Sequence, residues 1–160
     1  MFLSDKIYLS KMTHEVAQAY YKEFAHDPDV FADGQAFVHF IYSEEWVGRY
    51  LERHRNDEHL VIMRAGKPIG EILFKRIDKA TKSAVFSIHL QNDSVKGKGY
   101  GTLAEILAID YAFHKMGLQT IYADALKKNK RSIRVLEKVG FHFTGEDELF
   151  AYYQIENNKS

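Results

Sequence analysis

Three glycines alternate with larger residues in the segment that reads SVKGKGYGT, residues 94–102. Because Gly97, Gly99 and Gly101 carry no side chains, the backbone can approach a ligand closely there. The segment opens a helical pattern, and the first N–H groups of a helix have no intrahelical partner and carry partial positive charge. Two lysines, Lys96 and Lys98, add full charges. These features predict an anion site that would suit a pyrophosphate.

Two other phosphate-binding motifs do not fit this segment. A Walker A loop requires G-x-x-x-x-G-K-[ST], which the sequence lacks. A dinucleotide-binding G-x-G-x-x-G would need glycine where Thr102 stands, and it belongs in an opening βαβ unit. A glycine-rich turn without a ligand stays the alternative.

A second segment, residues 129–141, reads NKRSIRVLEKVGF. Asn129 is a good helix N-cap, and Gly140 is a good residue to end a helix. Ile133, Leu136 and Val139 form an apolar stripe at helical spacing. On its own, this segment is as consistent with a structural helix as with a binding site.

The elements that position these segments follow from hydrophobic periodicity and turn residues. Helices are expected after the N-cap Thr13 as far as residues 27–29, from Ser43 onward, over 101–116 and over 131–139, with an irregular stretch at 30–42. Strands are expected over residues 6–11, 60–64, 68–76, 84–90, 120–125, 141–144 and 150–155. The order β-α-α-β-β-β-α-β-α-β-β predicts an α/β (α+β) layered fold with a mostly antiparallel sheet.

Composition limits the function classes. The 160 residues suit one domain, 1–160, without a linker. Lysine plus arginine equals 22, as does aspartate plus glutamate, so the basic excess typical of a nucleic-acid binder is missing. There is no cysteine, and the eight histidines show no metal-binding spacing, so no metal is expected. No signal peptide or membrane-spanning run is recognisable, which predicts a cytoplasmic protein without a membrane partner.

Taken together, the two segments resemble the GNAT superfamily of acyl-CoA-dependent N-acetyltransferases. The family's loop [Q/R]-x-x-G-x-[G/A] corresponds to residues 96–101, and its N-x-x-[S/A]…E-K-x-G-F motif to residues 129–141. The resemblance covers residues 68–141 well, and the branch it suggests contains ribosomal-protein N-terminal and spermidine acetyltransferases. Lys96 stands at the position where members of the family usually carry arginine or glutamine. Leu136 stands where many members carry a tyrosine that protonates the departing thiolate.

The resemblance implies a central sheet of about seven strands flanked by helices, with acetyl-CoA as the co-substrate. The pantetheine arm would lie where two parallel strands, 84–90 and 120–125, separate. A primary amine (a peptide N-terminus, a polyamine or a small amine) would attack the thioester directly. The resemblance also leaves a homodimer open. The expected cofactor contacts are His89, Leu90, Lys96, Gly97, Lys98, Gly99, Tyr100, Gly101, Thr102, Asn129, Ser132 and Lys138.

The general base and general acid stay open. Glu71 and His89 are the candidates for the base. Each also has an alternative interpretation without a catalytic role: Glu71 as a solvent-facing residue of a half-exposed strand, and His89 as a packed polar residue. Ser132 is the first candidate for the acid. Further options are Glu146 and Glu148 as base and Tyr152 and Tyr153 as acid.

The acceptor amine is expected near residues 24–50, which mix aromatic residues with acids. These acids are Asp27, Asp29, Asp33, Glu44 and Glu45. On the helix after the glycine loop, Asp110 and His114 are expected to pair beside an apolar arc of Leu103, Ile106 and Phe113. A non-catalytic acyl-CoA-binding or regulatory module is the alternative function, and a protein-interaction domain is a third.

Overall fold

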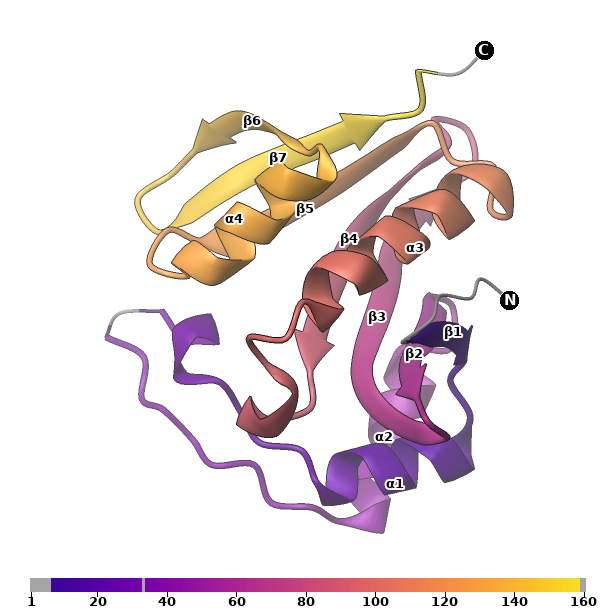
Figure 1. Ribbon diagram of the computed structural model, residues 1–160, viewed down its shortest axis with the longest axis vertical. Coiled ribbons are helices and arrows are strands. Elements are labelled where there is room, and N and C mark those ends of the chain that lie inside the picture. Colours follow the sequence, from indigo (N-terminus) through magenta and orange to yellow (C-terminus); the bar gives the residue numbers. More distant parts are fainter. Residues whose placement is uncertain (1–6, 33, 159–160) are drawn as a thin grey trace.

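The computed structural model of the protein describes residues 7–32 and 34–158 (Figure 1). The helices are α1 (His14–Lys22), α2 (Glu44–Arg53), α3 (Tyr100–His114) and α4 (Lys130–Val139), with short 3-10 turns η1 (Pro28–Val30) and η2 (Asp93–Val95). The strands are β1 (Tyr8–Lys11), β2 (Glu58–Arg64), β3 (Lys67–Asp78), β4 (Ser83–Leu90), β5 (Thr120–Leu126), β6 (His142–Glu146) and β7 (Phe150–Glu156). The expected order of elements is confirmed. The first expected strand begins at Lys6, which lies outside the described residues.

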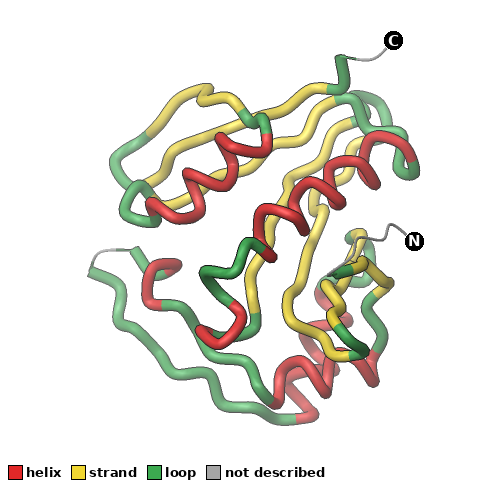
Figure 2. The backbone as a smooth tube through the Cα atoms, viewed as in Figure 1, coloured by secondary structure: helices red, strands yellow, loops and turns green. Residues whose placement is uncertain are grey.

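The seven strands form one sheet in the order β1-β2-β3-β4-β5-β7-β6. Every neighbouring pair is antiparallel except β4 and β5. That parallel pair is in register only from Ser83 opposite Thr120 to Val85 opposite Tyr122. Beyond Val85 the two strands diverge, as the tube in Figure 2 shows. The divergence divides the sheet and leaves room between its two halves.

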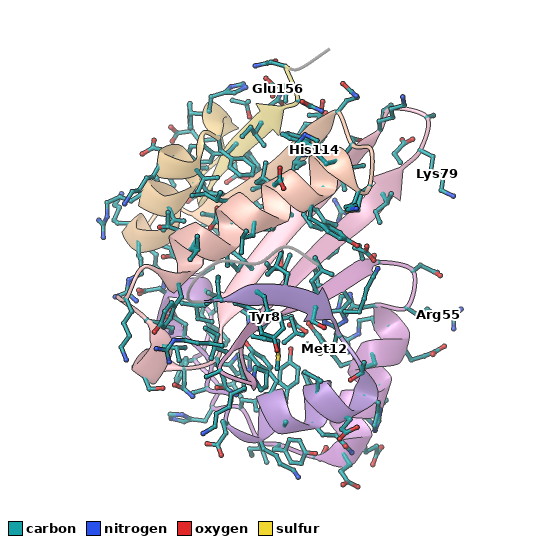
Figure 3. The ribbon with its side chains drawn as sticks, turned by 45° about the vertical axis from the view of Figure 1, so that its right-hand side comes forward. Tyr8, Met12, Arg55, Lys79, His114 and Glu156 are labelled. Atoms are coloured by element: carbon teal, nitrogen blue, oxygen red, sulfur yellow. The ribbon has the colours of Figure 1, made fainter. Side chains whose placement is uncertain are left out.

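Helices cover both faces of the sheet. α3 packs against β1 and β4, and α4 packs against α3 and β6. α1 packs against α2 and β3, and these two helices build a separate aromatic core around Tyr20, Tyr21 and Tyr50. With side chains added, Figure 3 shows α3 next to the edge strand that carries Tyr8.

The helix ends follow the local sequence. The side chains of Thr13, Ser43 and Asn129 accept hydrogen bonds from the first turns of α1, α2 and α4. Gly140 ends α4 with a φ of 119°, in the left-handed region that favours glycine. Among the helices of the described ranges, none is long and apolar enough to cross a membrane.

The expected apolar arc of α3 is wrong in one position. Ile106 is 49% exposed, whereas the buried face carries Ala104, Glu105, Ala108 and Ala112. Apolar residues occur all round this helix, so periodicity could not orient it. The expected pairing of Asp110 with His114 is confirmed, with 2.8 Å between Oδ1 and Nδ1.

Candidate active site

The glycine loop leads directly into the N-terminus of α3. Gly97 and Gly99 have φ angles of 73° and 84°, which L side chains rarely adopt. Gly99 is the N-cap of α3 and supplies no side-chain cap, so the first N–H groups of the helix stay open to a ligand. A Cβ at either glycine would meet no atom within 4 Å. The loop therefore presents free space and partial positive charge, which suits a phosphate group.

Lys96 is held in place by two carboxylates. Its Nζ lies 2.9 Å from Asp27 Oδ2 and 3.2 Å from Asp93 Oδ1, and its side chain is 12% exposed. Burial opposes ionisation of Asp27, but the hydrogen bonds from Lys96 and the Asp29 N–H, together with the charges of Lys96 and Arg131, outweigh it and hold the pKa of that carboxyl below its usual value. This ion pair ties the segment before η1 to the glycine loop.

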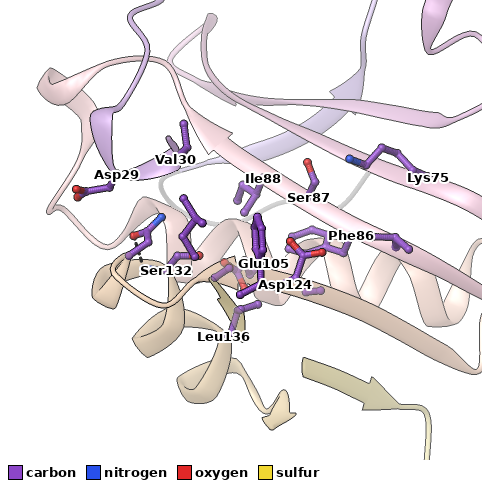
Figure 4. Close-up of a pocket in the computed structure, with 16 residues that line it drawn as sticks. Asp29, Val30, Lys75, Phe86, Ser87, Ile88, Glu105, Asp124, Ser132 and Leu136 are labelled. Atoms are coloured by element: carbon purple, nitrogen blue, oxygen red, sulfur yellow. Dashed lines mark hydrogen bonds between the residues drawn. The ribbon is translucent and has the colours of Figure 1, made fainter. Parts of the chain in front are cut away.

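The divergence of β4 and β5 opens a cleft with two connected parts. The smaller part, about 120 Å³, is lined by six of the residues that are expected to contact the cofactor. These are His89, Leu90, Lys96, Gly101, Asn129 and Ser132. The larger part, about 280 Å³, is lined by β4, β5, α3 and α4 and includes Asn129, Ser132 and Leu136 (Figure 4). Asn129, Ser132 and Ile88 line both parts.

The other expected cofactor residues lie outside this cleft. Gly97, Gly99 and Thr102 belong to the glycine loop and the first turn of α3. Lys98 and Tyr100 line a separate cavity beside Arg64 and Lys67. Lys138 is exposed in the last turn of α4, far along that helix from Asn129.

Asn129 and Ser132 begin α4 at the wall of the cleft. Asn129 Oδ1 accepts a hydrogen bond from the Ser132 backbone N–H at 3.2 Å, drawn as a dashed line in Figure 4. The capping bond uses the amide oxygen of Asn129 and leaves its NH₂ group to donate to a ligand. The side-chain hydroxyl of Ser132 makes no hydrogen bond among the described residues. Both groups are therefore available to an occupant of the cleft.

Glu71, on β3, is the centre of a buried polar cluster. It is 1% exposed, which excludes the interpretation of Glu71 as a solvent-facing residue. Its Oε1 accepts hydrogen bonds from Tyr21 Oη at 2.6 Å, Tyr50 Oη at 2.7 Å and His89 Nε2 at 2.5 Å. Its Oε2 is bonded to His59 Nε2. Burial opposes ionisation of Glu71, but the two imidazoles outweigh it and lower the pKa far below its ordinary value.

His89 connects this cluster to the cleft. It lies directly opposite Glu71 in the β3–β4 register, and its side chain is 31% exposed. Its Nδ1 is 2.8 Å from Tyr20 Oη, so both ring nitrogens have partners. The Phe24 ring packs edge-on against it at 5.2 Å. His89 can therefore contact a substrate, whereas Glu71 can act only through its neighbours.

The alternative candidates lie elsewhere. Glu146 pairs with Lys127, and Glu148 is exposed in the turn between β6 and β7. Tyr152 Oη donates to Asp147 at 2.5 Å, and Tyr153 Oη donates to Glu137 at 3.4 Å. None of these four candidates lines either part of the cleft.

The acidic and aromatic residues expected at the acceptor site are only partly brought together. Asp27 and Asp29 line the cleft from the η1 segment, while Glu44 and Glu45 lie exposed in the first turn of α2. Asp33 lies outside the described residues. The aromatic residues of α1 and α2 pack over Glu71 instead of lining the cleft.

Sequence reasoning missed Glu105 and the partners of Glu71. Glu105 is 2% exposed on α3 and lines both parts of the cleft. Glu105 lies four positions after Gly101 and three before Ala108, so helical spacing puts the three residues on one face of α3. This spacing could have indicated an acid on the same face as the glycine loop. Among the described residues, no group of three or more histidine and acidic side chains is arranged to hold a metal ion.

Comparisons with known proteins agree with this geometry. A family model described as an acetyltransferase (GNAT) domain matches residues 6–142. Spermidine N(1)-acetyltransferase of Escherichia coli K12 is 30% identical over 136 residues, which span 78% of this chain and 73% of that protein. The probable N-acetyltransferase YjcK of Bacillus subtilis is 36% identical over 103 residues. That match spans 62% of this chain and 57% of YjcK, a little over half of its length.

Solved structures share the fold. Ribosomal-protein-S5-alanine acetyltransferase from Vibrio fischeri superposes with a TM-score of 0.79 at 20% identity, covering 98% of this chain and 96% of that one. Dodecameric spermidine N-acetyltransferase from Vibrio cholerae gives a TM-score of 0.75 at 17% identity, covering 96% and 95%. The family model spans most of the sequence, and the same fold accounts for the glycine loop and the divergent strands. The chain therefore belongs to the GNAT family of acetyltransferases.

Proposed function

We propose that the protein transfers the acetyl group of acetyl-CoA to a primary amine, and that the cleft between β4 and β5 holds the pantetheine arm. GNAT acetyltransferases use acetyl-CoA as their co-substrate. The observation that carries the proposal is the meeting of the glycine loop, the diverging strands and the start of α4 at one cleft. The pyrophosphate would lie at the N-terminus of α3, and Asn129 would donate to the pantetheine arm.

The reaction needs no acyl-enzyme. The amine nitrogen attacks the thioester carbon, an N–C bond forms, the C–S bond breaks, and CoA leaves as the thiol. The amine must lose a proton, because alkyl ammonium groups are protonated at neutral pH. His89 is the base in this proposal, and it takes the proton at Nδ1 when Tyr20 releases that atom. Glu71 is a positioning residue, since a carboxylate behind an imidazole fixes its orientation and stabilises the imidazolium.

Acidic and basic side chains both line the cleft, so the carboxylates of Asp27 and Asp29, and not a net negative charge, are the groups that could contact a cationic acceptor. Asp27 and Asp29 line the cleft, and the ring of His89 offers aromatic surface in its smaller part. The relatives named for spermidine and for the alanine of a ribosomal protein both act on amines. We therefore propose spermidine and a peptide with N-terminal alanine as the first acceptors to assay. Turnover would exclude the non-catalytic acyl-CoA-binding module, which the acetyltransferase relatives do not favour.

We also propose that the protein self-associates, at least as a homodimer. The V. cholerae relative is dodecameric, and Phe37, Val38 and Ile41 are exposed apolar residues near one another in sequence. Light scattering after size exclusion tests this directly. A strictly monomeric profile across protein concentrations would contradict it.

Cofactor binding is tested by thermal shift with acetyl-CoA. At a hundred times its dissociation constant, a ligand stabilises the native state by about 2.7 kcal/mol, or several degrees for a chain of this size. Gly99→Glu should abolish the shift, because it places a carboxylate in the anion site. Gly117→Glu is the matched control, since Gly117 has a similar φ of 71° at the opposite end of α3. No shift in the wild-type protein, or equal shifts in all three proteins, would contradict the proposal.

A further inference from the structure

Glu105 is a buried carboxyl group for which the described part of the chain supplies no hydrogen-bond partner. It lies in the second turn of α3 and is 2% exposed. Its Oε1 is buried and accepts no hydrogen bond from any described residue. Native proteins pair nearly all such groups, because an unpaired buried polar atom reduces stability. An unpaired carboxyl at this position therefore suggests a partner that binds there.

The surroundings of Glu105 keep it protonated near neutral pH. Burial raises the pKa of this carboxyl to about 8. Acidic groups near the cleft are Asp27, Asp29 and Asp124, and the basic groups are Lys75, Lys96 and Arg131, together with His89. None of them forms an ion pair with Glu105, and Lys96 is already paired with Asp27. Glu105 is therefore a carboxylic acid that can donate a proton at physiological pH.

Glu105 lies in the wall of the cleft that is proposed to hold the pantetheine arm. Glu105 lines both parts of the cleft, as do Ser132 on α4 and Ile88 on β4. In Figure 4 it lies between Ile88 on one side and Ser132 and Leu136 on the other. Leu136, in the same wall, is apolar and cannot donate a proton. Among the side chains that line both parts of the cleft, Glu105 is the strongest proton donor.

We propose that Glu105 is the general acid that protonates the sulfur of CoA as it leaves. This inference rests on the proposed acetyl transfer. As the C–S bond breaks, the electron pair stays on sulfur, and the sulfur takes the proton of Glu105. The resulting carboxylate regains a proton from solvent when CoA dissociates. Because thiols ionise near pH 8.5, an acid with a pKa close to that value is well matched to a thiolate leaving group.

The test compares Glu105→Gln with the wild-type protein, with spermidine and an alanyl peptide as acceptors. Glutamine keeps the size and polarity of the side chain but cannot supply the proton. We expect kcat to fall by about 10²- to 10³-fold, while the KM for acetyl-CoA changes less than about threefold. The loss of wild-type kcat above about pH 8 should disappear in the variant. Asp110→Asn on the exposed side of α3 is the control and should leave kcat unchanged.

A second variant and a spectroscopic readout keep the proposal falsifiable. Glu105→Leu should fold at least as stably as wild type, because it removes an unpaired polar group, and should lose turnover equally. A protonated-carboxyl infrared band at pH 7 should be present in wild type and absent from Glu105→Gln. Unchanged kcat and pH profile in both variants would overturn the role of Glu105 alone. Failure of the wild-type protein to acetylate either acceptor would overturn the proposed function and this role together.

Discussion

Two buried glutamates of this protein have opposite ionisation states because their neighbours differ. Glu71 accepts hydrogen bonds from two tyrosines and two histidines, and the charges and hydrogen bonds of the two histidines lower its pKa despite its burial. Glu105 has no such donors in residues 7–32 and 34–158, and its burial raises its pKa to about 8. Two carboxyl groups whose pKa values differ in this way can take different parts in one reaction. In the present proposals, Glu71 stabilises a positive imidazole and Glu105 donates a proton.

Tyr20 and Tyr50 provide a matched test of the role of His89. Tyr20→Phe and Tyr50→Phe each remove one hydroxyl from the Glu71 cluster, and each should lower the free energy of unfolding by about 0.5–2 kcal/mol. Only Tyr20 bonds to His89, at Nδ1. Tyr20→Phe should therefore change the acid limb of the kcat/KM profile for the amine, because it removes the hydrogen bond to the atom that is proposed to accept the proton. Equal pH profiles for the two variants would argue against His89 as the base.

At the scale of elements, the close approach of β3 to β4 places His89. Gly70 lies opposite Leu90 in the register, beside the pair of Glu71 and His89. A Cβ at Gly70 would lie 3.1 Å from the backbone oxygen of His89 and 2.5 Å from Ile62 Cδ1. The absence of a side chain at Gly70 thus allows the strand that carries His89 to sit tightly against β3.

Replacing this glycine should therefore affect both stability and binding. Gly70→Ala should lower the free energy of unfolding by about 1–3 kcal/mol, the usual range for overpacking, and should weaken acetyl-CoA binding through displacement of β4. Gly48→Ala is the control, because a Cβ at Gly48 in α2 meets nothing within 4 Å. Alanine in a helix should stabilise the protein there by up to about 1 kcal/mol. Urea unfolding and the acetyl-CoA thermal shift measure the two effects, and a Gly70→Ala protein as stable as wild type would contradict this account.

The elements were largely predictable because their determinants are local. Thr13, Ser43 and Asn129 act as N-caps where the sequence indicates, and the glycine loop follows a strand and begins a helix. The cluster around Glu71 was not predictable, since its bonds join residues up to 69 positions apart and depend on the sheet register. The buried face of α3 could not be predicted from the sequence either. Periodicity could not decide which face of this evenly apolar helix is buried, so Glu105 was overlooked.

At the scale of the whole molecule, equal numbers of basic and acidic residues leave little net charge to govern the response to pH. Individual buried groups then dominate that response. Glu71 has a lowered pKa, so its stabilising contribution is complete above its unfolded pKa of 4.5 and declines as the pH falls below it. The contribution of Glu105 to stability depends on pH in the opposite direction. The unfolded chain releases that proton near pH 4.5, whereas the native protein holds it until about pH 8.

Stability should therefore decline between pH 4.5 and 8 through Glu105. In this window the native state binds more protons than the unfolded state, so raising the pH favours unfolding by up to about 1.4 kcal/mol per pH unit from this group. Urea unfolding of wild type and Glu105→Gln at pH 5, 6, 7 and 8 isolates the contribution of Glu105 to the pH dependence of the free energy of unfolding. The stability of the variant relative to wild type should increase steadily with pH across the series. A difference independent of pH would mean that Glu105 ionises alike in both states, and the protein would then lack the neutral acid that its cleft is proposed to contain.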